Sequence, residues 1–178
     1  MKTDRRTFLQ YLTSAAVTAA LPNSIERALA IPARRGSGTI DDVEHVVFLM
    51  QENRAFDHYF GTLRGVRGYG DPRPAILPSG KPVFFQPDGA GFLLPFHPQV
   101  NDFGLAFLED TPHGWPDTHR TWNGGKYDQW VPNKGRSTMA FYTRQDIPFI
   151  YALADAFTIC DAYHCSFLGA TDPNRYHM

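Results

Sequence analysis

The 178-residue chain has the composition of an ordinary globular protein, with 43% hydrophobic and 20% charged residues, and this composition excludes disorder for most of its length. Its 17 basic and 18 acidic residues give a formal charge of -1, and no basic stripe runs along the sequence, so nucleic acid is not an expected partner. The length suits one domain of about 100–200 residues.

Residues 1–30 are predicted to be an export signal outside the fold. Arg5 and Arg6 form a twin-arginine pair, an apolar run of small residues covers 11–21, and residues 28–30 read Ala-Leu-Ala, a suitable cleavage site. The run is shorter than the ~20 residues that span a bilayer; an amphipathic helix or a membrane anchor is the alternative. We therefore expect the twin-arginine translocase as a partner and a periplasmic or secreted protein, with residues 31–40 as a polar linker.

An apolar segment, Val46 to Met50, ends abruptly in a carboxylate and an amide, Glu52 and Asn53. It is short and partly β-branched, which predicts a strand buried on both faces of a parallel sheet. Aromatic residues at helical spacing then predict a helix that ends at Gly61. Ligands of open α/β sheets bind at the carboxyl ends of strands, so Glu52 and Asn53 are candidate ligands. The alternative is that Asn53 caps the helix and Glu52 favours its positive end.

Two loop-rich regions follow. Residues 61–91 are dense in Gly and Pro, which predicts turns and at most short edge strands. Residues 92–135 predict a long loop with three aromatic-rich turns and one short helix after Asp117. A loop of this length in a compact domain is usually functional, and it contains His113 in the sequence Pro-His-Gly-Trp.

Regular structure is predicted to return near residue 146. Residues 146–148, Asp-Ile-Pro, indicate a helix start with Pro in the first turn, and a second strand is expected from Phe157 to Tyr163. Strand, helix and strand in this order predict an α/β fold with a mainly parallel sheet.

The two cysteines, Cys160 and Cys165, are expected to be buried thiols. Five residues of extended strand span about 16 Å, whereas a disulfide requires α-carbons within ~7 Å of each other. Only a turn between the two cysteines would permit a bond. A zinc site is not expected, because the chain has no second pair of cysteines to complete four ligands.

The predicted second strand leads toward Thr171, which stands at the mouth of another expected helix. A hydroxyl at a helix N-terminus lies in the positive field of the backbone dipole, which favours an alkoxide and an incoming phosphate. The alternative is that Thr171 or Asp172 only caps the helix, with Pro173 in its first turn.

Three segments carry a combined motif: Gln51–His58, Pro112–Trp115 and Gly169–Arg175. Together they closely resemble the bacterial phospholipase C and acid phosphatase family of phosphoesterases, and the resemblance covers nearly all of residues 41–178. It is closest to the phosphocholine-preferring phospholipase C branch, which also has a twin-arginine signal, the stretch seen here at residues 65–74, and threonine where phosphatases often have serine. The sequence departs from the family in having Ala at positions 55 and 170, where Ser and Pro are usual.

The resemblance implies an alkaline-phosphatase-like α/β core and a hydrolase that cleaves phosphatidylcholine-type lipids to diacylglycerol and a phosphorylated headgroup, meeting a membrane surface transiently. Thr171 would be the nucleophile and form a covalent phospho-threonine intermediate. Glu52, Asn53 and Thr171 would bind a divalent metal, with Ca or another hard cation favoured by oxygen ligands. His113 would contact the phosphoryl oxygens, with nearby His119 as the alternative.

The resemblance implies that the family's remaining metal-binding acids and histidines would follow residue 178. Residues 41–178 are therefore expected to be the N-terminal part of the catalytic domain, with little or no activity alone. Two other functions stay open: an acid phosphatase that uses the same residues on monoesters, and an inactive secreted lipid-binding fragment. The loop aromatics could box a choline headgroup or simply pack; they are Trp115, Trp122, Tyr127 and Trp130.

Overall fold

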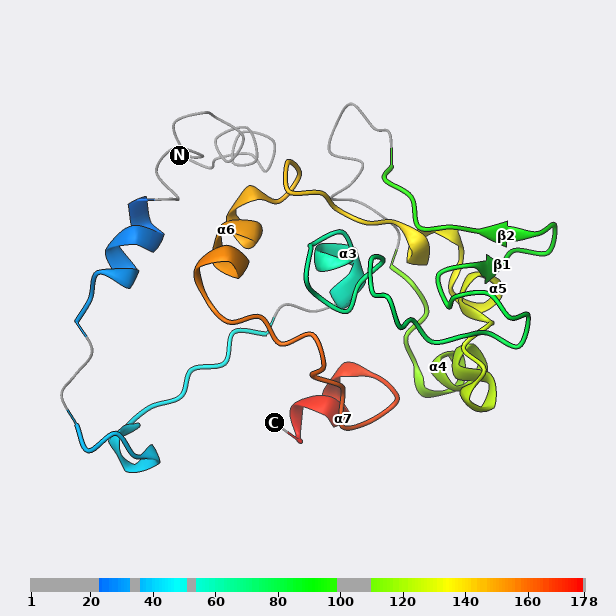
Figure 1. Cartoon of the computed structure of the whole chain (residues 1–178). Helices are drawn as coiled ribbons and strands as arrows, with labels where there is room; N and C mark the ends of the chain where they lie inside the picture. The colour runs from blue at the N-terminus through cyan, green and yellow to red at the C-terminus, as the bar shows by residue number, and fades with distance from the viewer. Residues whose placement is uncertain (1–22, 33–35, 51–53, 99–109, 178) are drawn as a thin grey trace, which may run out of the picture. The chain divides into compact units, whose positions relative to one another are not determined.

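The computed structural model describes residues 23–32, 36–50, 54–98 and 110–177 (Figure 1). The chain divides into two compact units. The first consists of residues 1–50 and 144–159, and the second of residues 51–143 and 160–178. Within the described ranges, none of the helices has the length and apolar character that a membrane span requires.

The described part of the first unit contains short helices joined by irregular chain. A helix covers residues 23–29, a 3-10 turn, η1, spans Ile40–Asp42, and α6 spans Pro148–Ala156. The Asp42 carboxylate accepts hydrogen bonds from the backbone N–H groups of Ser37 (3.0 Å) and Gly38 (2.6 Å), and these bonds lower the pKa of Asp42. The polar segment before η1 is therefore held against the Asp42 carboxylate at the end of η1.

Helix α6 confirms the start predicted near residue 146. Ile147 is the N-cap and Pro148 lies in the first turn, where a missing backbone N–H costs nothing. Arg144 forms an ion pair with Asp155, and its guanidinium carbon lies 4.8 Å from the centre of the buried Tyr151 ring. The residues before α6 are thus attached to the side of the helix.

The strands predicted at residues 46–50 and 157–163 are not formed. Residues 43–50 have no regular structure, and the side chains of Val47 and Leu49 are 90% and 85% exposed. Residues 158–160 are also irregular and a turn follows them. A strand persists where its backbone groups pair with a neighbouring strand, and among the described residues neither segment has such a neighbour.

The cysteine prediction is wrong in one respect. Cys160 and Cys165 are free thiols, as expected, but both are exposed. The strand predicted at residues 157–163, which contains Cys160, is not formed, so no sheet covers that cysteine in the described structure.

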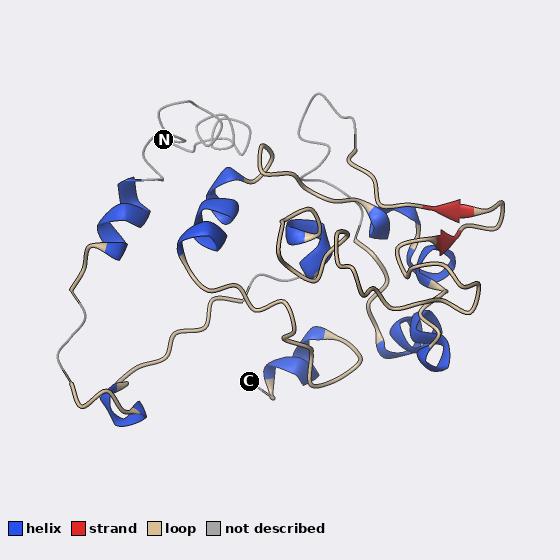
Figure 2. Ribbon diagram, viewed as in Figure 1, coloured by secondary structure: helices blue, strands red, loops and turns tan. Residues whose placement is uncertain are grey.

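The second unit contains a small antiparallel sheet (Figure 2). β1 (Gln86–Pro87) pairs with β2 (Phe92–Leu93), so that Gln86 lies opposite Leu93. β1 agrees with the prediction of at most short strands in residues 61–91, whereas β2 lies in the region predicted as a long loop. A single parallel bridge joins Phe96 to Ala140, but the described residues show no mainly parallel sheet. They combine helices with a small sheet, which is compatible with an α/β fold.

The described helices of this unit are short, and the region predicted as a long loop contains more of them than expected. α4 begins two residues before Asp117, because Pro116 and Asp117 itself both favour a first helical turn. The helical segments are α3 (Phe56–Phe60), α4 (Trp115–Trp122), η3 (Asn123–Gly125), α5 (Trp130–Lys134), η4 (Arg136–Met139) and α7 (Thr171–Arg175).

Helix α3 confirms the predicted end at Gly61, which is its C-cap, but the N-cap is Ala55 and not Asn53. Position 61 requires glycine because the Asp57 carbonyl and the Tyr69 ring lie close to its α-carbon. A Cβ there would lie 2.5 Å from the Asp57 carbonyl oxygen and 2.5 Å from the Tyr69 ring. Tyr69 also donates its backbone N–H to the Gly61 carbonyl at 2.7 Å, so the chain after α3 returns against the helix end.

A buried glutamine joins β1 to the loop before α5. Gln86 is 1% exposed, and its Nε2 donates to the carbonyls of Val83 (2.7 Å) and Tyr127 (2.9 Å). Its Oε1 accepts the Trp130 backbone N–H at 3.2 Å. Tyr127 has φ 56, a left-handed conformation that costs energy for a residue with a Cβ. The Gln86 amide therefore holds a strained loop in place.

We predict that Gln86→Leu lowers the free energy of unfolding by about 3 kcal/mol, because two carbonyls and one N–H lose their buried partner. Urea unfolding followed by circular dichroism measures the change. The matched control is Thr121→Val, since Thr121 is also 1% exposed but donates one hydrogen bond, to Asp117 O at 2.8 Å. It should cost less than about 1 kcal/mol. If Gln86→Leu and Thr121→Val lowered the free energy of unfolding equally, the organising role of Gln86 would be contradicted.

Candidate functional site

Two of the four predicted site residues are described by the structure. Glu52 and Asn53 lie outside the described residues, and His113 and Thr171 both lie in the second unit. Among the described residues, no three or more His, Cys, Asp or Glu side chains gather in a way that could hold a metal ion. The roles of Glu52 and Asn53 therefore stay predictions.

Thr171 is the first residue of α7, which confirms the helix predicted to begin there. The N-cap is Ala170, in an extended conformation with φ −73 and ψ 178, and it makes no side-chain cap bond. The alternative that Thr171 or Asp172 occupies the N-cap position is therefore wrong. Since the strand expected before this helix is not formed, other contacts must fix where α7 begins.

Asn174 supplies such contacts from within α7. Its Oδ1 accepts the Phe167 backbone N–H at 3.0 Å, and its Nδ2 donates to the Phe167 carbonyl at 2.9 Å and to the Ala170 carbonyl at 3.0 Å. The turn from Phe167 to Ala170 is thus tied to the helix that follows it. Sequence reasoning missed this residue, because an asparagine inside a motif does not show which backbone groups it will meet.

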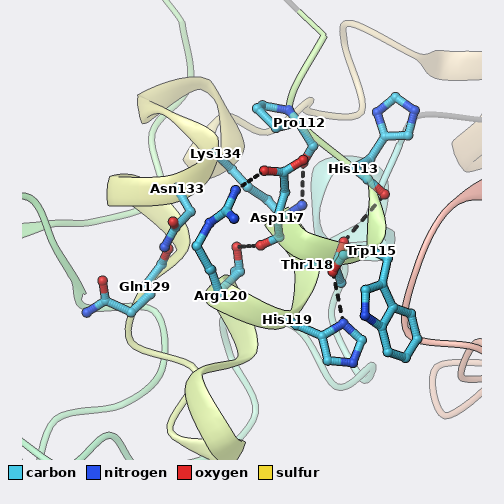
Figure 3. Close-up of polar contacts among 11 residues, drawn as sticks. Pro112, His113, Trp115, Asp117, Thr118, His119, Arg120, Gln129, Asn133 and Lys134 are labelled. Carbon is cyan, nitrogen blue, oxygen red and sulfur yellow. Dashed lines mark hydrogen bonds and ion pairs between the residues drawn. The ribbon is translucent and has the colours of Figure 1, made fainter.

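The loop that carries His113 is anchored by a buried lysine (Figure 3). Lys134, in α5, is 8% exposed, and its ammonium donates to the Pro112 carbonyl. Burial lowers the pKa of Lys134, while the charge of Asp117 acts in the opposite direction. Thr118 also donates its hydroxyl to the His113 carbonyl at 3.4 Å. The backbone on both sides of the His113 side chain is therefore held by α4 and α5.

The His113 imidazole has one nitrogen engaged. Its Nδ1 lies 2.9 Å from the Thr111 carbonyl oxygen and 3.7 Å from Asp110 Oδ2. A carbonyl can only accept, so Nδ1 carries the hydrogen, and in the neutral ring Nε2 carries the lone pair. Figure 3 shows the ring pointing away from Trp115 and His119. In this tautomer Nε2 can take up a proton and, once protonated, donate to an anionic oxygen.

His119, the alternative to His113, is placed differently. Its Nδ1 lies 2.9 Å from the carbonyl oxygen of Trp115, one turn earlier in α4. The ring centres of Trp115 and His119 are 3.6 Å apart, and Figure 3 shows both rings on one side of the helix. His119 therefore packs along α4, whereas His113 extends from the loop before it.

Trp115 brings the His113 loop and the Thr171 turn together. Its ring centre lies 4.9 Å from that of Phe167. A Cβ added to Gly169 would lie 2.7 Å from the Phe167 ring, too close without a shift, and 3.4 Å from Trp115, an ordinary contact distance. The packing of Trp115 thus joins two of the three sequence motifs.

A cavity of about 180 Å³ in the same unit was not anticipated from the sequence. Its walls come from distant segments and include Asp57, His58, Tyr69 and Gln86. Asp57 Oδ1 is buried and has no hydrogen-bond partner among the described residues, and burial raises the pKa of Asp57 to about 6. Burial lowers the pKa of His58, although its hydrogen bond to the Thr138 carbonyl opposes this. Neither His113 nor Thr171 lines this cavity.

Comparison with known proteins agrees with the three motifs. Non-hemolytic phospholipase C of Burkholderia pseudomallei is 62% identical over 98% of this chain and 26% of its own length. Hemolytic phospholipase C of Pseudomonas aeruginosa is 47% identical over 98% of this chain and 24% of its own length. Phospholipase C A of Mycobacterium tuberculosis is 43% identical over 97% of this chain and 36% of its own length. The chain thus spans about a quarter to a third of these relatives.

The family comparison covers most of the chain. The family model described as "Phosphoesterase family" matches residues 43–178, and these residues contain all three motifs from which the resemblance was inferred. The resemblance is confirmed: the chain belongs to the phosphoesterase family.

Proposed function

We propose that the full-length protein is a metal-dependent phospholipase C that cleaves phosphatidylcholine-type lipids to diacylglycerol and a phosphorylated headgroup. The names of the relatives, all phospholipases C, support this reaction class. The structural observation that carries it is the packing of Trp115 against the turn before Thr171. This contact supports the proposal because it joins the turn before Thr171 to the helix that follows the His113 loop, and a hydroxyl and an imidazole are groups that phosphoryl transfer uses.

The proposed reaction proceeds in two steps through Thr171. In the first, the Thr171 hydroxyl gives up its proton as its oxygen bonds to phosphorus, the bond to the diacylglycerol oxygen breaks, and that leaving oxygen takes up one proton. In the second, water attacks phosphorus and gives up a proton, the bond to Thr171 breaks, and the Thr171 oxygen takes up one proton as the phosphorylated headgroup leaves. His113 would donate from Nε2, in its protonated form, to a phosphoryl oxygen, because its Nδ1 is already engaged with Thr111.

The proposed cation would be held by Glu52, Asn53 and Thr171. Their carboxylate, amide and hydroxyl oxygens suit a hard divalent cation such as Ca. When bound, such a cation would offset the charge on the phosphoryl oxygens and make the threonine proton easier to lose.

The core of the full-length protein is proposed to be alkaline-phosphatase-like, with a mainly parallel sheet. The support comes from residues 46–49, an exposed apolar run in this structure that pairing with neighbouring strands would cover. An experimental structure of the full-length protein that left this run outside any sheet would contradict the proposal.

We predict that Thr171→Ala removes nearly all hydrolysis of phosphatidylcholine or of a chromogenic phosphocholine ester by the full-length protein, whereas Thr171→Ser keeps a measurable part because the hydroxyl survives. Turnover and melting temperature are measured on the same preparations. The control is Thr39→Ala, which changes the N-cap of η1 and should leave turnover intact. Turnover by Thr171→Ala at a rate comparable to that of the unaltered protein would exclude Thr171 as the nucleophile. Preference for a phosphomonoester over the diester would instead favour an acid phosphatase.

We predict that Glu52→Gln lowers both metal content and turnover of the full-length protein while the circular dichroism spectrum stays unchanged, because the neutral amide binds a hard cation less well than the carboxylate. Elemental analysis of the purified protein measures the metal. Glu44→Gln serves as the control, since it removes the same charge from a residue exposed in the irregular stretch after η1. Normal metal content and turnover in Glu52→Gln would remove Glu52 from the site.

We predict that changing Arg5 and Arg6 to Lys holds the precursor in the cytoplasm, because the twin-arginine translocase reads the arginine pair and not its charge alone. Cell fractionation with an antibody against the protein measures the distribution. The control is the change of Arg34 and Arg35 to Lys, which makes the same substitution in the proposed linker. Equal export of the Arg5 and Arg6 variant and the unaltered protein would refute the proposed route to the periplasm or the medium.

A further inference from the structure

The side chain of Asn174 uses its whole amide on the turn before Thr171. Both hydrogens of Nδ2 are directed to carbonyls, those of Phe167 and Ala170, and Oδ1 accepts the Phe167 N–H. Asn174 thus satisfies both backbone groups of Phe167, as a neighbouring strand would, and also holds the residue directly before Thr171. One side chain therefore holds the turn from Phe167 to Ala170.

Packing fixes the other side of the same turn. The Phe167 ring lies against Trp115 with centres 4.9 Å apart, and Gly169 has no room for a Cβ beside the Phe167 ring. The Gly169 backbone N–H donates to the Phe167 carbonyl at 2.9 Å. The two rings and the Asn174 amide together fix the backbone of residues 167–170, which directly precede Thr171.

The start of α7 depends on this arrangement. The helix has five residues, and its N-cap, Ala170, has no polar side chain to cap it, so the helix's own hydrogen bonds hold its first residue weakly. The conformation of Ala170 sets the direction in which the Thr171 side chain leaves the backbone. A displacement of about 1 Å at a reacting group can cost about a hundredfold in rate.

We propose that Asn174 is a positioning residue for Thr171. It acts through the backbone of Phe167 and Ala170, and it does not itself touch the substrate. The inference rests on the proposed function, in which Thr171 is the nucleophile. It assigns to Asn174 the task of holding the threonine oxygen in the direction of attack.

The test compares Asn174→Ala with Asn133→Ala in the full-length protein, using a chromogenic phosphocholine ester. Asn133 is a matched control, because it also lies in a five-residue helix and donates from Nδ2 to a backbone carbonyl, that of Gln129, at 3.0 Å. At a temperature where circular dichroism shows each variant folded, Asn174→Ala should lower kcat about 10- to 100-fold and change KM by less than about threefold. Asn133→Ala should leave both kcat and KM close to those of the unaltered protein.

Ala170→Pro supplies a rescue that a merely structural role would not give. Ala170 has φ −73, close to the value of about −65° that a proline ring imposes, so proline fixes the same turn by another route. The double variant Ala170→Pro with Asn174→Ala should recover part of the kcat lost by Asn174→Ala alone. If Asn174→Ala does not fold, Asn174→Asp is measured instead, because its carboxylate keeps the acceptor for the Phe167 N–H and removes the two donors: a lower kcat with unchanged KM supports the proposal, and an unchanged kcat overturns it.

The two proposals fail differently. A folded Asn174→Ala protein with the kcat of the unaltered protein overturns the positioning role, while an inactive Thr171→Ala protein in the same assay leaves the nucleophile standing. An active Thr171→Ala protein overturns both. A kcat that falls only in step with the unfolded fraction, without recovery by proline, reduces Asn174 to a stability role and overturns the inference.

Discussion

In the second unit, a few side-chain amides join segments that regular backbone pairing does not connect. Its described sheet has two residues in each strand, so its other backbone groups pair within helices and turns or with side chains. Gln86 provides three of them from a position that is 1% exposed. Because these bonds reach Val83, Tyr127 and Trp130, one buried amide joins the Gly- and Pro-rich region to the helices that follow it.

Hydrogen bonds from side chains to backbone groups also hold the turns around the candidate site. Asn174 pairs with the backbone of Phe167 and Ala170, and the buried ammonium of Lys134 pairs with the carbonyl of Pro112. Unlike a sheet, which fixes many residues at once, each of these contacts fixes one turn. Loops held in this way can place functional side chains accurately while the helices around them remain only one or two turns long.

The chain belongs to the phosphoesterase family, and Trp115 connects two of the motifs that indicated it. Trp115 follows the His113 loop, and its ring packs against Phe167 in the turn before Thr171. The cavity beside Asp57 and His58 is a separate feature, since neither proposed residue lines it. It shows that this unit buries titratable groups away from the proposed nucleophile.

The sequence by itself determined the local features. The end of α3 at Gly61, the start of α6 near Pro148, the start of α7 at Thr171 and the short strand β1 among Gly and Pro residues follow from signals within a few residues of each other. The family was also readable, because its motifs are continuous stretches of chain. Such signals depend on backbone conformation and helical spacing, which neighbouring residues set.

Only the tertiary structure decided what each segment meets. Residues 46–50 have the pattern of a buried strand, yet they are irregular and exposed here, because a strand requires a partner that its own sequence cannot supply. Nor could the sequence show that Gln86, Lys134 and Asn174 each bind backbone groups of another segment or turn. Hydrogen bonds and packing between residues distant in sequence depend on how the chain returns on itself, and that is a property of the folded molecule.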